Sequence, residues 1–164
     1  YANSNTLFMN YYDKIAKSYH ELHSEEQAKK MKVIKSLISP KKSESLLDVG
    51  CGTGLSSDWK CNVVGVDPSF GLVTQGKGNR VQGFGEHLPF QDSSFDYIIC
   101  VTALGNFSDV EKGLKEMKRV GKGKVVVSFL KRSSKSDTIM KAIKKVFTIN
   151  ETVEEEKDII LLLE

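Results

Sequence analysis

The nine residues LLDVGCGTG, at positions 46–54, constrain the fold more than any other stretch of this chain. They overlap an apolar segment, SLLDV at 45–49, that is typical of a strand buried on both faces. Three glycines follow within five positions, at Gly50, Gly52 and Gly54. Because glycine has no Cβ, such a turn can adopt unusual backbone dihedrals and lets a ligand approach the main chain. The stretch predicts a buried strand that ends in a tight, ligand-sized corner.

The rest of the chain alternates between helical and extended patterns, which favours a parallel sheet with crossover helices. Apolar residues recur at helical spacing through 13–38, as one bent helix or two, and Pro40 then stops the pattern. The same spacing recurs through 110–120, where Asp109 can cap the helix start. A basic helix is expected around 137–145. Further strands are predicted at 62–66, 80–84, 96–102 and 124–130, and a final antiparallel pair at 147–154 and 158–163.

Length and composition favour one soluble domain. At 164 residues the chain is long enough to bury a sizeable core but short for two domains. Its residues are 40% apolar and 27% charged, and the sequence contains no run of 18 apolar residues of the kind that could cross a bilayer. Nothing near Tyr1 resembles a secretory signal, so a cytoplasmic location is expected. The three cysteines, Cys51, Cys61 and Cys100, form no C-x-x-C pair and are predicted to be small buried hydrophobes rather than disulfide partners or zinc ligands.

The position of Asp67 favours a nucleoside ligand. Asp67 ends the second predicted strand, nineteen positions after Asp48, and at that separation an acidic side chain can meet the hydroxyls of a ribose held over a glycine turn. The alternative is a ligand-free glycine turn with an Asp that merely caps Pro68 and Ser69. The spacing here is G-x-G-x-G rather than the G-x-G-x-x-G of dinucleotide sites, and no Walker-type lysine follows the glycines.

At this point the chain resembles a known family. The stretch LDVGCGTG closely resembles motif I of the class I S-adenosylmethionine-dependent methyltransferases. The segments YYDKIAKSYH, VVGVDPS, EHLPFQDSSFDYIIC and VEKGLKEMKRV then follow in the order found in the branch similar to the ubiquinone/menaquinone-biosynthesis methyltransferases. The resemblance covers nearly the whole chain. It implies an α/β fold: a Rossmann-like, mostly parallel seven-stranded sheet with an antiparallel C-terminal hairpin and helices on both faces.

The resemblance also implies S-adenosylmethionine as cofactor, with S-adenosylhomocysteine as product. The glycine turn would line the methionyl part, Asp48 would help hold its ammonium group, and Asp67 would accept both ribose hydroxyls through its two oxygens. Residues 1–40 would form an N-terminal helical lid segment within a single domain, 1–164, whose cofactor-binding core is 41–164. The implied cofactor-binding residues are Asp48, Gly50, Cys51, Gly52, Gly54, Asp67, Pro68, Ser69, Phe84, Gly85, Glu86 and Val101.

Two features depart from the family pattern. Phe84 stands where the family usually has an acidic residue that contacts the adenine amino group. Either Phe84 packs on the adenine face, with Gly85 or Glu86 supplying a polar contact, or the adenine pocket is weakened; an ordinary core role in the third strand is equally open. The crossovers at 55–62 and 70–79 are also shorter than the dozen residues that a βαβ connection usually needs. Two explanations are open. Either the crossovers are degenerate elements, with room for little over one helical turn in the first, or mobile residues are missing from the sequence.

The family's reaction is an in-line displacement of the methyl group, here to a small-molecule acceptor at oxygen or carbon. The sulfonium supplies the reactivity, so the protein mainly aligns the reactants and excludes water, and no catalytic residue is required. A general base, where one is needed, has weak candidates in Tyr19, His20, His23 and His87. The plain alternative for each histidine is solvent exposure or a structural hydrogen bond.

Residues 101–107 would line both cofactor and acceptor pockets in the family. Asn106 could hydrogen-bond an acceptor there, or simply cap the loop. No N-P-P-Y-like sequence or Pro-Cys pair is present, which disfavours methylation of adenine or glutamine nitrogen and of cytosine C5. No D-x-D or H-x-x-x-H arrangement indicates a metal.

Two other functions stay open. Between positions 112 and 145 there are twelve basic and two acidic residues, which favours an RNA methyltransferase that binds phosphates. Against this, Lys115, Lys118 and Lys122 fit the solvent face of an amphipathic helix, and no aromatic residues for base stacking are interleaved with them. The other alternative is a non-catalytic methyltransferase-fold subunit that binds a partner protein. The sequence leaves the oligomeric state unknown.

Overall fold

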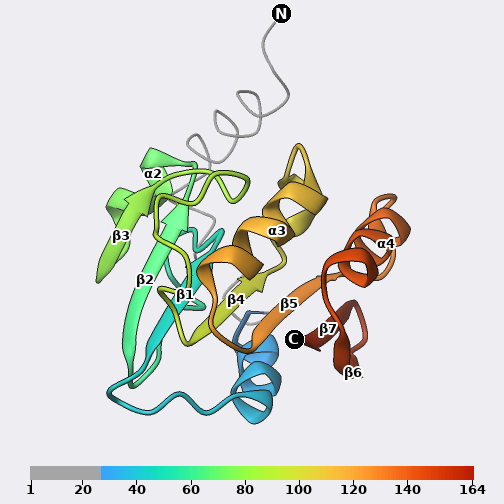
Figure 1. The fold of residues 1–164 in the computed structure, drawn as a ribbon, viewed down its shortest axis with the longest axis horizontal. Helices are drawn as coiled ribbons and strands as arrows, with labels where there is room; N and C mark the ends of the chain where they lie inside the picture. Colours follow the sequence, from blue (N-terminus) through green and yellow to red (C-terminus); the bar gives the residue numbers. More distant parts are fainter. Residues whose placement is uncertain (1–26) are drawn as a thin grey trace, which may run out of the picture.

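The computed structural model describes residues 27–164, and its centre is one seven-stranded sheet (Figure 1). Across the sheet the strand order is β3-β2-β1-β4-β5-β7-β6. The four neighbouring pairs from β3 to β5 are parallel, whereas β7 runs antiparallel to both β5 and β6. The strands are β1 Ser45–Val49, β2 Asn62–Asp67, β3 Asn79–Gln82, β4 Tyr97–Val101, β5 Val125–Leu130, β6 Ile149–Glu154 and β7 Asp158–Leu163. The expected mostly parallel sheet with an antiparallel C-terminal hairpin is confirmed.

The helices largely follow the predicted ranges. A helix covers residues 27–37, and the others are α2 Phe70–Gln75, the short 3₁₀ helix η1 Leu104–Asn106, α3 Val110–Val120 and α4 Ser136–Val146. At the start of α3 the Asp109 side chain accepts a hydrogen bond from the backbone N–H of Lys112, as the capping prediction requires. Within residues 27–164, no helix has the length and apolarity needed to cross a membrane.

Successive side chains of each strand alternate between the two faces of the sheet. In β4, Ile98 joins one hydrophobic cluster and Ile99 joins the other. The first cluster includes α3 and α4, which contribute the buried residues Leu114, Met117, Val120, Ile139, Ala142 and Ile143. The second cluster includes the helix at 27–37. Helices therefore cover both faces of the sheet, as the resemblance implies.

The described part of the predicted lid belongs to the core. Met31, Ile34 and Ile38 are buried and pack in one cluster with Leu46 of β1 and Val126 of β5. The part of the predicted lid segment that the structure describes thus packs on the sheet. Residues 1–26 lie outside the described residues.

Both short crossovers lack a full-length helix. The chain passes from β1 to β2 through turns at 50–61, and these residues form no helix, not even the single turn that their number allows. The indole N–H of Trp59 donates to the Ser56 carbonyl at 2.9 Å, and Trp59 packs against the sheet in place of a crossover helix. The second crossover holds only the six residues of α2.

The cysteines are only partly as predicted. Cys51 and Cys100 are buried, and burial raises the pKa of both thiols, which keeps them protonated and unreactive. Cys61, directly before β2, is half-buried, so it is not the buried hydrophobe expected.

Candidate functional site

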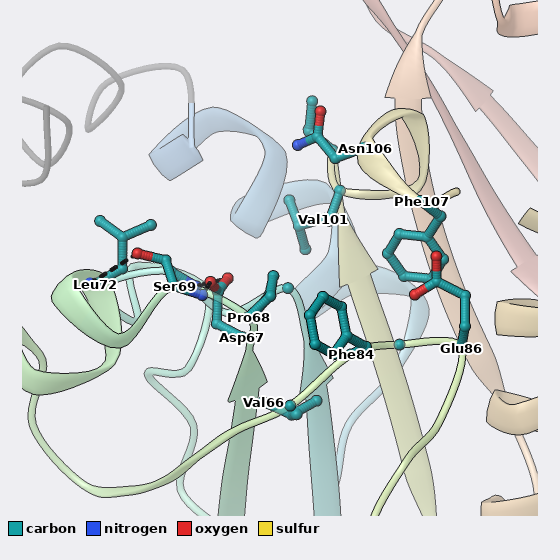
Figure 2. A pocket seen from close by; sticks show the side chains of 16 residues that line it. Val66, Asp67, Pro68, Ser69, Leu72, Phe84, Glu86, Val101, Asn106 and Phe107 are labelled. Carbon is teal, nitrogen blue, oxygen red and sulfur yellow. Dashed lines mark hydrogen bonds between the residues drawn. The ribbon is translucent and has the colours of Figure 1, made fainter. Parts of the chain in front are cut away.

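A pocket opens at the carboxyl ends of β1, β2 and β4 (Figure 2). Because β1 lies between β2 and β4, the strand order reverses at this point, and α/β sheets bind ligands at such a switch point. Nine predicted residues line the pocket: Gly50, Gly52, Asp67, Pro68, Ser69, Phe84, Gly85, Glu86 and Val101. Seven further lining residues are Val66, Leu72, Gly83, Thr102, Ala103, Asn106 and Phe107.

The glycine turn after β1 is held against the end of β2 by backbone hydrogen bonds. The N–H groups of Gly50 and Cys51 donate to the Val66 carbonyl at 2.8 and 3.1 Å. Gly50 has a φ of 75°, in the left-handed region, and a Cβ at this position would collide with the Cβ of Ala103 after β4. Glycine is therefore required at position 50 for both conformation and space, so the floor of the pocket is bare main chain.

Asp67 organises the pocket at the end of β2. Its Oδ2 accepts from the backbone N–H of Gly52, and its Oδ1 accepts from the N–H of Ser69, both at 2.9 Å. Ser69 in turn caps α2, because its hydroxyl accepts from the N–H of Leu72 at 3.3 Å, as the dashed line in Figure 2 shows. Each carboxylate oxygen can accept more than one hydrogen bond, so this geometry is compatible with a ribose at the same group.

Three predicted residues do not line the pocket, and the first is Asp48. Its side chain is fully buried behind the turn, where Oδ2 accepts from the hydroxyls of Ser56 and Ser57 at 2.6 Å each. Its Oδ1 is buried without a hydrogen-bond partner among the described residues. Burial outweighs the two serine bonds and raises the pKa of Asp48 to about 6.

The other two are Cys51 and Gly54, which face the protein rather than the pocket. Cys51 packs over Gly65 of β2, where a Cβ would meet the Cys51 sulfur. A Cβ at Gly54, or at Gly76 after α2, would overlap the guanidinium of Arg80. Gly54 therefore makes room for an arginine from β3, not for a ligand. The local sequence motif carries no signal for this, because Arg80 lies 26 positions away.

Phe84 is not a core residue of the third strand. β3 ends at Gln82, and Phe84 lies beyond it with 38% of its surface exposed, on the wall of the pocket. Glu86, by contrast, is buried, and its Oε1 accepts from the N–H and the hydroxyl of Ser108 at 2.7 and 2.9 Å. The Glu86 carboxylate is thus engaged with the loop that precedes α3.

The predicted general-base candidates are not assembled at the pocket in the described region. His87 is exposed, does not line the pocket, and has its Nε2 at 2.8 Å from the Lys112 ammonium. Tyr19, His20 and His23 lie outside the described residues.

Of the lining residues that were not in the predicted set, four fall in 101–107, the stretch that the resemblance marked as pocket-lining: Thr102, Ala103, Asn106 and Phe107. Val66 belongs to the quoted segment VVGVDPS but was not in the predicted set, and Leu72 and Gly83 lie outside the quoted segments. Val66 and Gly83 lie at the neighbouring carboxyl ends of β2 and β3, and Leu72 is on α2.

A doubly wound sheet with a glycine turn after β1 and an acidic residue at the end of β2 defines a protein of the class I methyltransferase fold. The chain belongs to the methyltransferase domain family, whose model matches residues 47–129. Two solved structures share the fold: a possible histamine N-methyltransferase of Thermotoga maritima and the magnesium protoporphyrin IX methyltransferase of Synechocystis, the latter with bound S-adenosylmethionine. Their TM-scores are 0.73 and 0.77 at 19% and 14% identity, and the alignments cover 93% and 99% of this chain and 97% of each structure.

Curated relatives are similar over part of their length. An uncharacterized protein of Methanocaldococcus jannaschii is 35% identical over 117 residues, which cover 67% of this chain and 45% of the relative. The demethylmenaquinone methyltransferase of Corynebacterium kroppenstedtii is 37% identical over 98 residues, or 56% of this chain and 43% of the relative. That of Staphylococcus epidermidis is 30% identical over 160 residues, or 87% and 65%. The chain thus spans less than half the length of the first two relatives.

Proposed function

We propose that this protein transfers the methyl group of S-adenosylmethionine to a small-molecule acceptor, at oxygen or carbon. The observation that carries the proposal is the continuity of one pocket. Asp67 lies on one side of it, and Asn106 and Phe107 lie on the other (Figure 2). A cofactor held at the first side would therefore meet an acceptor held at the second.

The residues present fit S-adenosylmethionine. A bare main chain at Gly50 and Gly52 suits the methionyl part, and Asp67 stands where the ribose hydroxyls would lie. The exposed ring of Phe84 offers an apolar surface for the adenine face. The unpaired Oδ1 of Asp48 lies behind the turn, where its negative charge would attract the ammonium group.

The chemistry asks little of the chain beyond placement. When bound, the sulfonium supplies an electrophilic methyl group: an electron pair of the acceptor forms the new bond to carbon while the carbon–sulfur bond breaks, and S-adenosylhomocysteine leaves. The protein aligns the two molecules and excludes water. The apolar side chains of Leu72, Val101 and Phe107 in the lining suit both tasks.

For the acceptor we propose an aromatic hydroquinone. Two of the relatives are demethylmenaquinone methyltransferases, and their names supply this chemical class. An electrophilic methyl group needs an electron-rich partner, so the reduced ring is the form that can react at carbon. The apolar side chains of Val101 and Phe107 in the lining suit a fused aromatic ring.

RNA methylation receives less support from the basic region. Lys115 and Lys145 both pair with Glu111, at 2.8 and 3.1 Å, and Lys122 pairs with Asp96 at 3.1 Å. Arg119 binds the Glu116 carboxylate through two nitrogens. Basic side chains with acidic partners in the protein are poorer phosphate ligands, because each partner must be displaced. A non-catalytic partner subunit would not need the formed pocket, and direct binding separates it from an enzyme.

The test has two stages. Isothermal titration with S-adenosylmethionine and S-adenosylhomocysteine should give micromolar binding. Incubation with methyl-labelled cofactor and a short-chain demethylmenaquinol should then yield a product heavier by one methyl group, and fragmentation in a mass spectrometer should place it on carbon or oxygen. Absence of binding would favour the partner subunit, and binding that brings label into RNA but not into the quinol would favour the RNA alternative.

A further inference from the structure

Lys30 is a buried lysine directly behind the pocket wall. It comes from the helix at 27–37, is 6% exposed, and places its ammonium 3.3 Å from Asp158 Oδ2 at the start of β7. The same ammonium donates to Thr102 Oγ1 at 2.9 Å. A buried ion pair stabilises a fold poorly, because desolvation of two charges offsets their attraction. Stability alone therefore does not explain the Lys30–Asp158 ion pair. Thr102, which accepts a hydrogen bond from Lys30, lines the pocket.

Thr102 is held in a conformation that its side chain disfavours. It follows the last residue of β4 with a φ of 57°, a region that β-branched residues rarely enter. Its backbone N–H donates to both the carbonyl and the hydroxyl oxygen of Ser128 in β5, each at 3.0 Å. These bonds hold the backbone of Thr102, a residue that lines the pocket and whose hydroxyl contacts Lys30.

The donors and acceptors around Thr102 determine the direction in which its hydroxyl proton points. An ammonium only donates, so Thr102 Oγ1 accepts from Lys30. Ser128 Oγ already accepts from the Thr102 N–H, and either hydroxyl could donate across the 3.3 Å contact between Ser128 Oγ and Thr102 Oγ1. Because Ser128 is fully buried and Thr102 Oγ1 is the acceptor available to it within the described part of the chain, the proton of this contact is assigned to Ser128. Thr102 Oγ1 then accepts twice, and its own proton is left to donate to a molecule in the pocket. Donors in such a chain strengthen one another in a low-dielectric site.

We propose that the Thr102 hydroxyl donates a hydrogen bond to an oxygen of the acceptor, and that Lys30, held by Asp158, is a positioning residue that strengthens this donor. The proposal rests on the methyl-transfer function proposed above. It names the acceptor class as a phenol or hydroquinone whose ionised oxygen lies next to Thr102. Lys30 would then be about 5–6 Å from that oxygen, since two hydrogen bonds in series separate them.

This arrangement favours the ionised acceptor. Lys30 rather than Asp158 is the member of the ion pair that contacts Thr102, so the pair presents its positive end toward the acceptor, and a positive charge at about this distance lowers the pKa of a nearby acid. The acceptor hydroxyl gives its proton to solvent, and the electron pair of the oxyanion is delocalised into the ring. A ring carbon would then form the bond to the methyl group as the carbon–sulfur bond breaks and S-adenosylhomocysteine leaves, and the ring C–H proton would pass to solvent, which restores aromaticity. Transfer at oxygen uses the same oxyanion directly.

The first readout does not depend on turnover. We would titrate 1-naphthol, whose absorbance changes on ionisation, in the presence of protein saturated with S-adenosylhomocysteine. The pKa of bound naphthol should lie about one pH unit below that of free naphthol. Thr102→Val, which keeps the shape and removes the hydroxyl, should abolish this difference, whereas Thr102→Ser should preserve it. Thr148→Val, at an exposed site, is the matched control.

The lysine is tested by removing both charges. Lys30→Met alone leaves the Asp158 carboxylate buried and unpaired, which can unfold the protein. The double variant Lys30→Met/Asp158→Leu is therefore compared with it, because replacing a buried ion pair by apolar residues is well tolerated. In the double variant the naphthol pKa should return toward its free value. With demethylmenaquinol as acceptor, the kcat against pH profile should move up by about one pH unit.

The outcomes separate this proposal from the broader function. Wild-type protein that fails to bind S-adenosylhomocysteine contradicts the proposed function itself. Wild-type protein that binds it but does not bind naphthol, or a naphthol pKa that is unmoved by Thr102→Val and by the double variant, overturns the role of Thr102 and Lys30 and leaves methyl transfer standing.

Discussion

Asp67 joins the end of β2 to the glycine turn, because its Oδ2 accepts a hydrogen bond from the backbone N–H of Gly52 at 2.9 Å. The turn thus keeps its conformation through the same carboxylate that is proposed to bind the ribose. Asp67 also ties the start of α2 to the turn through Ser69. One side chain therefore sets the geometry of three walls of the pocket.

Replacing Asp67 with Ala should weaken the binding of S-adenosylhomocysteine by about a hundredfold or more, because two hydrogen bonds to a charged group are lost, each worth about 1.5–3 kcal/mol. Isothermal titration measures the loss. Asp58→Ala is the matched control, since the Asp58 side chain is 95% exposed and, within residues 27–164, its ion pair is with Lys35 at the surface. Unchanged affinity in Asp67→Ala, with a folded protein by circular dichroism, would count against the assigned site.

Gly50→Ala should lower stability by about 1–3 kcal/mol and abolish cofactor binding, because the new methyl group meets Ala103 while the backbone stays at a φ of 75°. Two glycines separate these causes. Gly78 has a φ of 89° but open space around it, so Gly78→Ala tests strain alone. Gly105 has open space and no positive φ, so Gly105→Ala should be nearly silent. Equal effects of all three substitutions in urea denaturation would contradict the steric argument.

Phe84→Ala should weaken S-adenosylhomocysteine binding by about 5- to 150-fold, because stacking of a base on an aromatic ring contributes about 1–3 kcal/mol. Phe84→Leu retains apolar area without a ring face and should recover only part of the loss. Folding stability should change little in either variant, since Phe84 is 38% exposed. A large fall in the melting temperature without loss of affinity would place Phe84 in a structural role instead.

Asp48→Asn should stabilise the folded protein at pH 7.5. Burial raises the pKa of Asp48 from 3.8 to about 6, so the folded state holds the proton more tightly than the unfolded state. The favourable contribution of the protonated carboxyl is full below pH 3.8 and is lost as the pH rises to about 6. The neutral Asn avoids this loss, so the free energy of unfolding of Asp48→Asn should exceed that of the wild type by at most about 3 kcal/mol at pH 7.5. Urea denaturation at pH 5 and pH 7.5 measures the free energy of unfolding of both proteins. A difference between wild type and variant that does not grow with pH contradicts the prediction.

The same titration should govern cofactor affinity. If the ionised Asp48 attracts the ammonium group, wild-type affinity for S-adenosylhomocysteine should rise about tenfold from pH 5 to pH 7.5, because near a pKa of about 6 only a tenth of the carboxyl is ionised at the lower pH. Asp48→Asn should bind more weakly at pH 7.5 and show a flat profile. Parallel slopes in the two proteins would assign the pH dependence to other groups.

The amino-acid sequence by itself determined the local elements. The apolar run of β1, the glycines at 50–54 and the aspartate at 67 predicted a buried strand that ends in a ligand-sized corner, on the side of the pocket where the cofactor is proposed to bind. Asp109 and the 3.6-residue spacing after it predicted α3. These features are encoded within a few neighbouring residues, because backbone conformation and hydrophobic periodicity are local properties.

Only the tertiary structure decided which distant side chains meet. Lys30 and Thr102 are separated by 72 positions, and their hydrogen bond depends on where the helix at 27–37 crosses the end of β4. Gly54 belongs to the motif but makes room for Arg80, and Asp48 belongs to it but lies behind the pocket. Packing across a sheet is set by register and crossover length rather than by any local pattern. The polar wall proposed to face the acceptor therefore becomes visible only when the strands and the helix are in place.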